Sequence, residues 1–185
     1  MLIYAMGVSA DGFVADRDGN FDWGPLSDEL SAAHTERVGS LGGYLLGRRL
    51  YTDMRVWETE PAMRATPGGA EFADIWSALP KVVFSRSLPE VHGNARIASA
   101  PLAEELAALA SGGADVEIGG PGLAAQAIEL DLVDEYRIFR YPVVAGGGTP
   151  YLPPVDRPLP LELVETRAFG PVVYERYRRA RGPRN

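Results

Sequence analysis

Short apolar runs alternate along the 185-residue chain with segments in which apolar residues recur at helical spacing. The runs are bounded by glycine, proline or aspartate, which is typical of strands buried in a sheet. In the other segments apolar residues lie three and four positions apart, the spacing of one helix face. The pattern predicts strands at 2–8, 13–15, 44–46, 81–85, 95–98, 116–118, 135–144, 161–168 and 171–178. It predicts helices at 28–38, 50–57, 72–79, 101–110 and 123–130.

Local signals refine these boundaries and point to a fold class. Ser27 is expected to cap the first helix, because a serine oxygen accepts a hydrogen bond from a free N–H of the first turn. The segment 58–69 is rich in proline, threonine and glycine, and we expect a surface loop there. Strands that alternate with helices, followed by a closing hairpin, predict an α/β fold. Its sheet should be mostly parallel, with helices on both faces and an antiparallel edge.

One stretch combines a strand, a glycine turn and a helix. The run 116–118 enters Gly119-Gly120-Pro121-Gly122, and a helical pattern begins near Leu123. This order points free backbone N–H groups and the positive end of a helix at an anion. The stretch has neither the lysine of a Walker A motif nor the spacing Gly-x-Gly-x-x-Gly. A tight turn without a ligand is equally compatible with these residues.

Composition narrows the class of protein. The chain is 46% hydrophobic and 23% charged, which is ordinary for one globular domain over residues 1–185. It contains no cysteine, so we expect neither disulfides nor a thiolate metal site, and no other metal site is indicated. The formal net charge of −7 argues against binding to nucleic acid. We see no membrane span or signal peptide, so the cytoplasm is the default location.

The C-terminus departs locally from this acidic character. Arginines gather there at positions 176, 178, 179, 181 and 184. They are compatible with a solvated strand end, with a subunit contact or with a ligand that carries phosphate.

The motifs in their order resemble a known family. They are Ser9-Ala10-Asp11-Gly12-Phe13-Val14-Ala15, Gly47-Arg48-Arg49, Val82-Val83-Phe84-Ser85-Arg86, Gly119-Gly120-Pro121-Gly122 and Pro142-Val143-Val144-Ala145-Gly146-Gly147-Gly148. Together they resemble the dihydrofolate reductase-like superfamily, and more closely the reductase domain of the bifunctional riboflavin-biosynthesis deaminase-reductase. The absence of cysteine leaves no zinc deaminase half, so the resemblance is to a stand-alone reductase domain. It implies a three-layer fold, NADPH as cofactor and a pairing of subunits into a homodimer.

The resemblance implies that NADPH lies across the sheet edge. Arg48, Arg49, Ser85 and Arg86 follow two predicted strands, and open α/β sheets bind ligands at the carboxyl ends of their strands. Arginine suits the 2′-phosphate because its planar guanidinium donates two hydrogen bonds at once. Surface arginines at strand ends are the plain alternative. Gly47 and the turn Gly119-Gly120-Pro121-Gly122, with Leu123 after it, would bind the pyrophosphate half of the cofactor.

The nicotinamide and substrate positions also come from the resemblance. Ala5, Phe13 and Val14 would line an apolar nicotinamide pocket, with Phe13 also facing substrate, and Gly146 would lie in the loop on its other side. Trp23 would cover the substrate. As ordinary core and loop residues, the same side chains need no ligand.

Two acids are candidates for the proton that accompanies hydride transfer. Asp11 stands at the break after the first strand, where it would face the floor of the pocket. Asp28 follows Trp23 by five residues, a spacing similar to that of the tryptophan and the substrate-binding acid of dihydrofolate reductases. The alternatives are an Asx-type turn for Asp11 and a helix N-terminus for Asp28.

Two departures from the family leave the activity open. Ala10 stands where leucine is usual, and Leu50 where threonine is frequent, so Tyr51 or Thr52 would have to supply that hydroxyl. The leading hypothesis is an NADPH-dependent reductase of a pyrimidine or pteridine-like substrate. A non-catalytic nucleotide-binding domain with the same cofactor site is the main alternative, and a flavin-dependent enzyme is a third.

Overall fold

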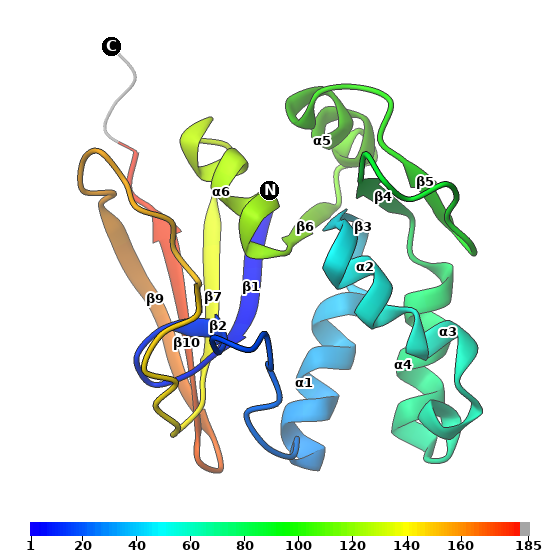
Figure 1. Cartoon of the computed structure of the whole chain (residues 1–185), viewed down its shortest axis with the longest axis horizontal. Helices are drawn as coiled ribbons and strands as arrows, with labels where there is room; N and C mark the ends of the chain where they lie inside the picture. Colours follow the sequence, from blue (N-terminus) through cyan, green and yellow to red (C-terminus); the bar gives the residue numbers. More distant parts are fainter. Residues whose placement is uncertain (182–185) are drawn as a thin grey trace.

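The computed structural model describes residues 1–181 and contains one large sheet. Within this range, eight strands pair in the order β5-β4-β3-β6-β1-β7-β10-β9 (Figure 1). They are β1 (Leu2–Val8), β3 (Leu41–Gly47), β4 (Lys81–Phe84), β5 (Ala95–Ile97), β6 (Asp115–Gly119), β7 (Glu135–Arg140), β9 (Leu161–Phe169) and β10 (Val172–Arg179). In this sheet order, neighbouring strands from β5 through β7 are all parallel to each other. Strand β10 runs antiparallel to both of its neighbours, β7 and β9. The mostly parallel sheet and its closing hairpin are confirmed.

Helices cover both faces of this sheet. On one face α1 (Asp28–Gly39) and α4 (Pro67–Ala78) pack on the core, and on the other α5 (Leu102–Ala110) and α6 (Pro121–Glu129) do so. The short helices α2 (Arg48–Met54) and α3 (Val56–Thr59) and the 3₁₀ turn η1 (Pro61–Arg64) follow β3. The predicted cap of α1 is confirmed, since Ser27 Oγ accepts from Leu30 N at 3.2 Å. Among the described helices, none is long and apolar enough to cross a membrane.

The central strand β1 is buried on both faces, which explains its continuous apolar sequence. Tyr4 faces the side of α6, whereas Ile3 faces the side of α1. The ring of Tyr4 stacks on that of Tyr151 at 4.3 Å, and each hydroxyl donates to the other residue's carbonyl oxygen at 3.0 and 2.9 Å. The segment that follows β8 (Thr149–Pro150) is thereby fixed to β1. β8 itself pairs with β2 (Phe13–Ala15).

Several predicted boundaries differ from the structure. The strand predicted at 44–46 extends over 41–47, and the helix predicted at 50–57 is divided into α2 and α3. The segment 58–69 is not a loop, because it contains part of α3, all of η1 and the start of α4. Pro67 opens α4 at its first position, and Thr66 Oγ accepts from Gly69 N at 3.1 Å. The strand predicted at 135–144 ends at Arg140, since its partner β1 ends at Val8 and Pro142 has no N–H to donate.

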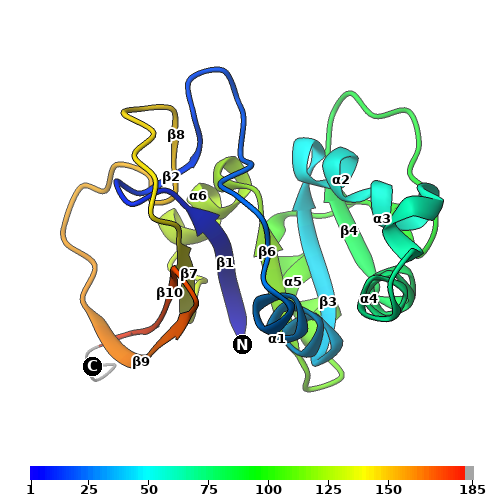
Figure 2. The same ribbon diagram turned by 90° about the horizontal axis from the view of Figure 1, so that it is seen from below.

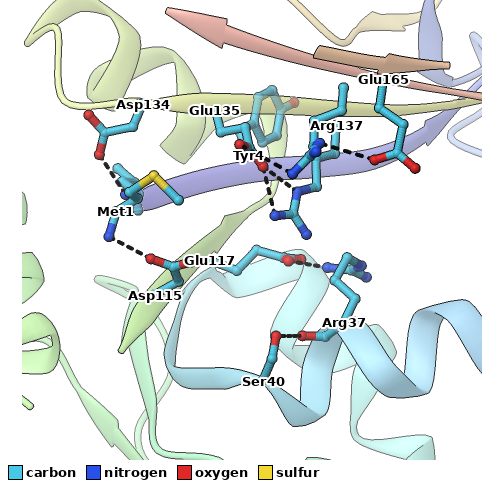
Figure 3. A network of polar contacts seen from close by, with 12 residues as sticks. Met1, Tyr4, Arg37, Ser40, Asp115, Glu117, Asp134, Glu135, Arg137 and Glu165 are labelled. Atoms are coloured by element: carbon cyan, nitrogen blue, oxygen red, sulfur yellow. Dashed lines mark hydrogen bonds and ion pairs between the residues drawn. The ribbon is translucent and has the colours of Figure 1, made fainter. Parts of the chain in front are cut away.

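Paired charges lie buried beside the central strand (Figure 3). Glu117 on β6 is fully buried, and its carboxylate accepts from the Tyr44 hydroxyl at 2.6 Å and from the Arg37 guanidinium of α1. Glu135 on β7 is equally buried and accepts from Arg137 Nε at 2.7 Å. A carboxylate can stay buried only when such partners compensate its lost hydration. The pair of Arg37 and Glu117 therefore holds α1 against the sheet.

Three of the C-terminal arginines, Arg176, Arg179 and Arg181, form ion pairs within the chain. Arg176 reaches Glu165 at 3.2 Å, and Arg179 reaches Asp131 at 3.1 Å. Arg181 pairs with Asp131 and Asp134. These pairs favour the interpretation as a strand end over a phosphate site. Arg184, which belongs to the same sequence cluster, lies outside the described residues.

Glu105 on α5 gives the fold a titratable contact. Its carboxylate accepts from the Arg96 guanidinium and from the backbone N–H groups of Ser99 and Ala100. The hydrogen bond from Arg96 is the largest cause that lowers the pKa of Glu105 to about 2 from its ordinary value of 4.5, against the opposing effect of desolvation. A carboxyl group whose pKa is lower in the folded state than in the unfolded state stabilises the fold at pH values above its unfolded pKa. That stabilisation is lost as the pH falls to the folded pKa.

Replacing Glu105 by glutamine should therefore remove about 2 kcal/mol of stability at pH 7, after allowance for the half-exposed arginine. The gap between wild type and variant should shrink as the pH falls from about 4.5 to 2, where the wild-type carboxyl becomes protonated. Urea denaturation at a series of pH values measures this. A gap that stays constant over that window would contradict the assignment.

Candidate functional site

The segments predicted to bind phosphate leave the sheet at the same edge. β4, β3 and β6 are parallel neighbours, with Gly47 opposite Phe84 and Leu46 opposite Gly119. Adjacent strands of a sheet lie about 4.8 Å apart, so the three loops begin side by side. Figure 2 shows β1, β3 and β4 pointing to this edge, with β2 and β8 beside the end of β1. The segments around residues 48, 86 and 120 therefore lie together.

Glycine is required where β6 passes into α6. A Cβ on Gly119 would lie 2.3 Å from Leu50 Cδ2 and 2.8 Å from the ring of Tyr44. Gly120 has φ of 93°, which side chains other than glycine rarely adopt, and its position allows close approach to the backbone of Gly47. The glycines thus bring the starts of α2 and α6 against each other.

Alanine substitutions in this turn should have unequal costs. Gly119→Ala should lower the free energy of unfolding by about 1–3 kcal/mol, because the added carbon overpacks Leu50 and Tyr44. Gly122→Ala is the matched control, since nothing lies within 4 Å of its added carbon and its φ is not positive. It should be neutral or stabilising by up to about 1 kcal/mol. Urea denaturation compares the two, and equal costs would contradict this packing.

No side chain within residues 1–181 caps the helices that start at this edge. Gly47 is the N-cap of α2 and Gly120 that of α6, and neither has a side chain to offer. The first N–H groups of α2 and α6 therefore face outward beside the positive ends of two helix dipoles. Pro121 at the first position of α6 removes one N–H that would be unpaired anyway. Gly122 is exposed, whereas the side chain of Leu123 is buried in the core.

The arginines of the two strand ends are free of internal partners. Across residues 1–181, Arg48, Arg49 and Arg86 make no ion pair or side-chain hydrogen bond, and all three are exposed. This distinguishes them from the paired C-terminal arginines. Ser85 Oγ accepts from Ser87 N and Leu88 N, and its own hydrogen finds no acceptor in the described part of the chain. Unpaired guanidinium groups, a free hydroxyl and free N–H groups form an arrangement that fits phosphate.

A cavity of about 520 Å³ opens next to this cluster. Its volume is typical of a small-molecule site. It lies over the carboxyl end of β1 and beneath the loop between β2 and α1. The lining consists of Met6, Gly7, Val14, Ala15, Gly19, Phe21, Asp22, Trp23, Gly24, Leu26, Arg49, Leu50, Asp53, Gly120, Pro121, Tyr141 and Thr149. Most of these side chains are apolar or aromatic, so the walls would exclude water from a bound ring.

The cavity includes some of the predicted ligand-binding residues and leaves out others. Val14, Trp23, Arg49, Gly120 and Pro121 line it. Ala5 and Phe13, also predicted to line the nicotinamide pocket, are not among its lining residues. Ala5 is buried in the core on the side of α1, and Phe13 is half-buried and pairs with Pro150. Trp23 Nε1 is buried with no partner among the described residues, which is a costly state for an N–H donor.

Asp11 does not face the cavity as predicted. Its carboxylate is exposed and accepts from Ser9 Oγ at 2.7 Å, from Ala145 N at 3.0 Å and from Gly146 N at 2.8 Å. The hydrogen bond from Ser9 is the largest cause that lowers the pKa of Asp11 to about 2. An acid that is ionised and already bonded in this way is poorly placed to give a proton. The contacts favour a structural role, in which Asp11 ties the loop after β7 to the end of β1.

Asp28 also lies outside the cavity lining. It is the first residue of α1, exposed and adjacent to the cap Ser27. A carboxylate at this position interacts favourably with the helix dipole. The structure thus favours the alternative stated for Asp28, and the loop residue Asp22 lies in the cavity wall in its place.

The glycine loop 146–148 packs against the segment after β2. Gly146 donates to Asp11 and accepts from Arg17 Nη2 at 2.7 Å, and it does not line the cavity. All three glycines have positive φ, and a Cβ on Gly148 would lie 2.1 Å from the carbonyl oxygen of Ala15. The loop positions Thr149, which does line the cavity.

The hydroxyl that Leu50 lacks is not replaced by its neighbours. Tyr51 is buried, and its hydroxyl accepts from His92 N at 2.8 Å. Thr52 is exposed and donates to the Arg48 carbonyl oxygen at 3.0 Å. Neither residue lines the cavity, and both hydroxyls already form hydrogen bonds within the chain, whereas Leu50 gives the cavity an apolar wall.

Sequence reasoning missed Asp53 and Tyr141. Asp53 follows Arg49 by one helical turn, so both face the cavity from α2, and this spacing is the signal that could have identified it. Desolvation raises the pKa of Asp53, while Arg49 lowers it to a smaller extent. The ring of Tyr141 lies over Gly7, where an added Cβ would be 3.2 Å from Cε2. Burial, and next the Asp22 carboxylate, raise the pKa of Tyr141.

Comparisons with known proteins identify the family of the chain and proteins of similar sequence. The family model of the RibD C-terminal domain matches residues 1–174. The uncharacterized protein YyaP of Bacillus subtilis (strain 168) is 28% identical over 173 residues, which are 91% of this chain and 88% of that protein.

Two solved structures share the fold. A putative riboflavin biosynthesis protein from Shewanella sp. PV-4 matches with a TM-score of 0.77 and 22% identity, over 97% of this chain and 99% of that chain. A dihydrofolate reductase from Enterococcus faecalis, complexed with NADP(H), matches with a TM-score of 0.61 and 19% identity, over 98% and 97%. The fold is therefore dihydrofolate reductase-like.

Proposed function

Because the chain belongs to the RibD C-terminal domain family, we propose that it is a reductase that uses NADPH to reduce a pyrimidine or pteridine-like heterocycle. The observation that carries this proposal is the cluster of unpaired cations and free N–H groups at the edge of the cavity. NADPH, when bound, supplies the hydride. The residues of the chain bind it, orient it and exclude water from the reacting rings.

The phosphate groups of NADPH would bind to the unpaired arginines and free N–H groups of the cluster. Arg48 and Arg86 follow adjacent strands and have no partners within residues 1–181, so they are available to a 2′-phosphate. The free N–H groups at the start of α6, with Gly120 beside Gly47, are suited to the pyrophosphate. This division accounts for the position of Arg48 and Arg86 outside the cavity lining, whereas Arg49 lines the cavity.

The apolar part of the site suits the two rings. Met6, Val14 and Leu50 form walls near the start of α6, and Trp23 stands in the loop across the cavity. A nicotinamide held between such walls would be shielded from water beside its substrate. The dihydrofolate reductase with the same fold is described as a complex with NADP(H), which supports a nicotinamide cofactor here.

The proposal is tested by adding NADPH and NADH to the purified protein and following tryptophan fluorescence, to which Trp23 in the cavity wall should respond. Saturable binding, tighter for NADPH, is the expected result, followed by NADPH oxidation with a suitable heterocycle. Saturable binding with no oxidation across a panel of pterins and aminopyrimidines would favour a non-catalytic nucleotide-binding domain. Absence of binding for both cofactors would overturn the proposal.

We further propose that the protein forms a homodimer. β9 is the last strand at one end of the described sheet, and Leu163 and Val164 on it are exposed. An edge strand with free backbone groups and apolar side chains is suited to pairing with another copy. Size-exclusion chromatography with light scattering should give twice the chain mass of 20.0 kDa, and a monomer at micromolar concentration would contradict this.

A further inference from the structure

We infer that the substrate of this cavity is an unphosphorylated nitrogen heterocycle that presents N–H donors, or a protonated ring nitrogen, to Asp53. The inference rests on the function proposed above and concerns the class of molecule that lies beside the cofactor.

The charges of the lining are the first observation. Asp22 and Asp53 line the cavity, and Arg49 is the cationic side chain among the lining residues. The formal charge of the walls is therefore −1, on a chain whose formal net charge is −7. Arg48 and Arg86 lie outside the lining, where they are available to the cofactor. A substrate phosphate inside the cavity would meet two carboxylates and compete for a single guanidinium.

The state of Asp53 is the second observation. Its carboxylate is half-buried, and within residues 1–181 it accepts no hydrogen bond and forms no ion pair, even with Arg49 on the same helix face. Because Asp53 is partly buried and its carboxylate has no partner among the described residues, its oxygens remain available to a ligand in the cavity, and the partial burial is consistent with its raised pKa. Donors on a ligand would satisfy it. Asp22, in contrast, already accepts from Gly24 N at 3.1 Å.

The shape of the walls is the third observation. Phe21, Trp23 and Tyr141 offer aromatic surfaces, and Met6 and Leu50 add apolar ones. Flat walls with one carboxylate that has no partner within residues 1–181 suit a planar ring whose edge carries amino or protonated nitrogen groups. The same walls offer no additional cation to a phosphorylated side chain.

The test is isothermal titration calorimetry of the NADPH-saturated protein with three probes. These are 2,4-diaminopyrimidine, cytidine and cytidine 5′-monophosphate, of which the last two differ only by a phosphate. Wild type should bind 2,4-diaminopyrimidine, and it should bind cytidine at least as tightly as its monophosphate. Asp53→Asn should weaken binding of 2,4-diaminopyrimidine by roughly tenfold to a hundredfold, the loss of a charge-assisted hydrogen bond. Asp156→Asn, an exposed acid outside the lining, is the control and should change nothing.

Two results would overturn the inference. One is binding of cytidine 5′-monophosphate that is at least tenfold tighter than that of cytidine. The other is failure of 2,4-diaminopyrimidine to bind, or binding that Asp53→Asn leaves unchanged. NADPH affinity is measured separately for each variant, and it should be the same in all. If NADPH binds while either result is found, only the substrate inference falls. If NADPH does not bind, the proposed function falls, and the probes are then compared on the free protein.

Discussion

Replacing Glu117 by glutamine is expected to lower the free energy of unfolding by about 3–5 kcal/mol, the usual cost of breaking a buried ion pair from one side. The carboxylate is fully buried, and the substitution leaves the guanidinium of Arg37 without its counter-charge. For a chain of this size the melting temperature should fall by roughly 6–20 °C. Thermal and urea unfolding measure the loss.

Two further variants distinguish the effect of breaking the buried Arg37–Glu117 pair from the effect of losing any charged residue. Asp74→Asn breaks the exposed pair with Arg64 and should cost at most about 1 kcal/mol. The double variant Arg37→Met/Glu117→Gln should be more stable than Glu117→Gln alone, because no unpaired charge remains and glutamine still accepts from Tyr44. A double variant that is less stable than the single one would contradict this account of α1.

The double substitution Arg48→Ala/Arg86→Ala should weaken NADPH binding by about a hundredfold and change NADH binding by less than about threefold. Each arginine is expected to make a charge-assisted bond to the 2′-phosphate of about 1.5 kcal/mol or more. NADH lacks that phosphate. Because the two arginines are exposed, the loss should be smaller at high salt. Fluorescence titration of both cofactors measures the two affinities.

Arg178→Ala is the control for this pair of substitutions. Arg178 is exposed and lies opposite Glu135, at the amino end of β7 and hence at the other edge of the sheet. The substitution Arg178→Ala removes an arginine charge as the double substitution does, and it should leave NADPH binding unchanged. An equal loss for NADPH and NADH in the double variant would contradict the assignment of Arg48 and Arg86 to the 2′-phosphate.

The sequence predicts the strands and most helices because their signals are local. β1 and β4 are continuous apolar runs, and Ser27 caps α1 as its position indicates. The failure at 58–69 has a long-range cause. Trp57 packs on Phe72 at 4.5 Å, and Glu58 reaches the buried Lys81 at 3.2 Å, so this segment folds onto α4. Proline and glycine content alone favours a loop there.

The backbone segments that form the site could be predicted from the sequence, but the positions of its acidic side chains could not. Gly120 and the arginines after β3 and β4 follow from strand ends and glycine geometry, which a sequence shows. The direction of Asp11 depends on Ala145 and Gly146, more than 130 residues away, and no local pattern carries that contact. The spacing from Arg49 places Asp53 on the same helix face, but its position in the cavity wall depends also on the distant loop that contains Trp23.

The central claim is that three loops at one sheet edge bind a single phosphorylated dinucleotide. The most direct test is a titration of the ¹⁵N-labelled protein with NADPH, followed through the backbone amide resonances. The account predicts that amides in segments 47–50, 85–87 and 119–123 shift together along one binding curve. Shifts confined to one of these segments, or located at the opposite edge of the sheet, would contradict it.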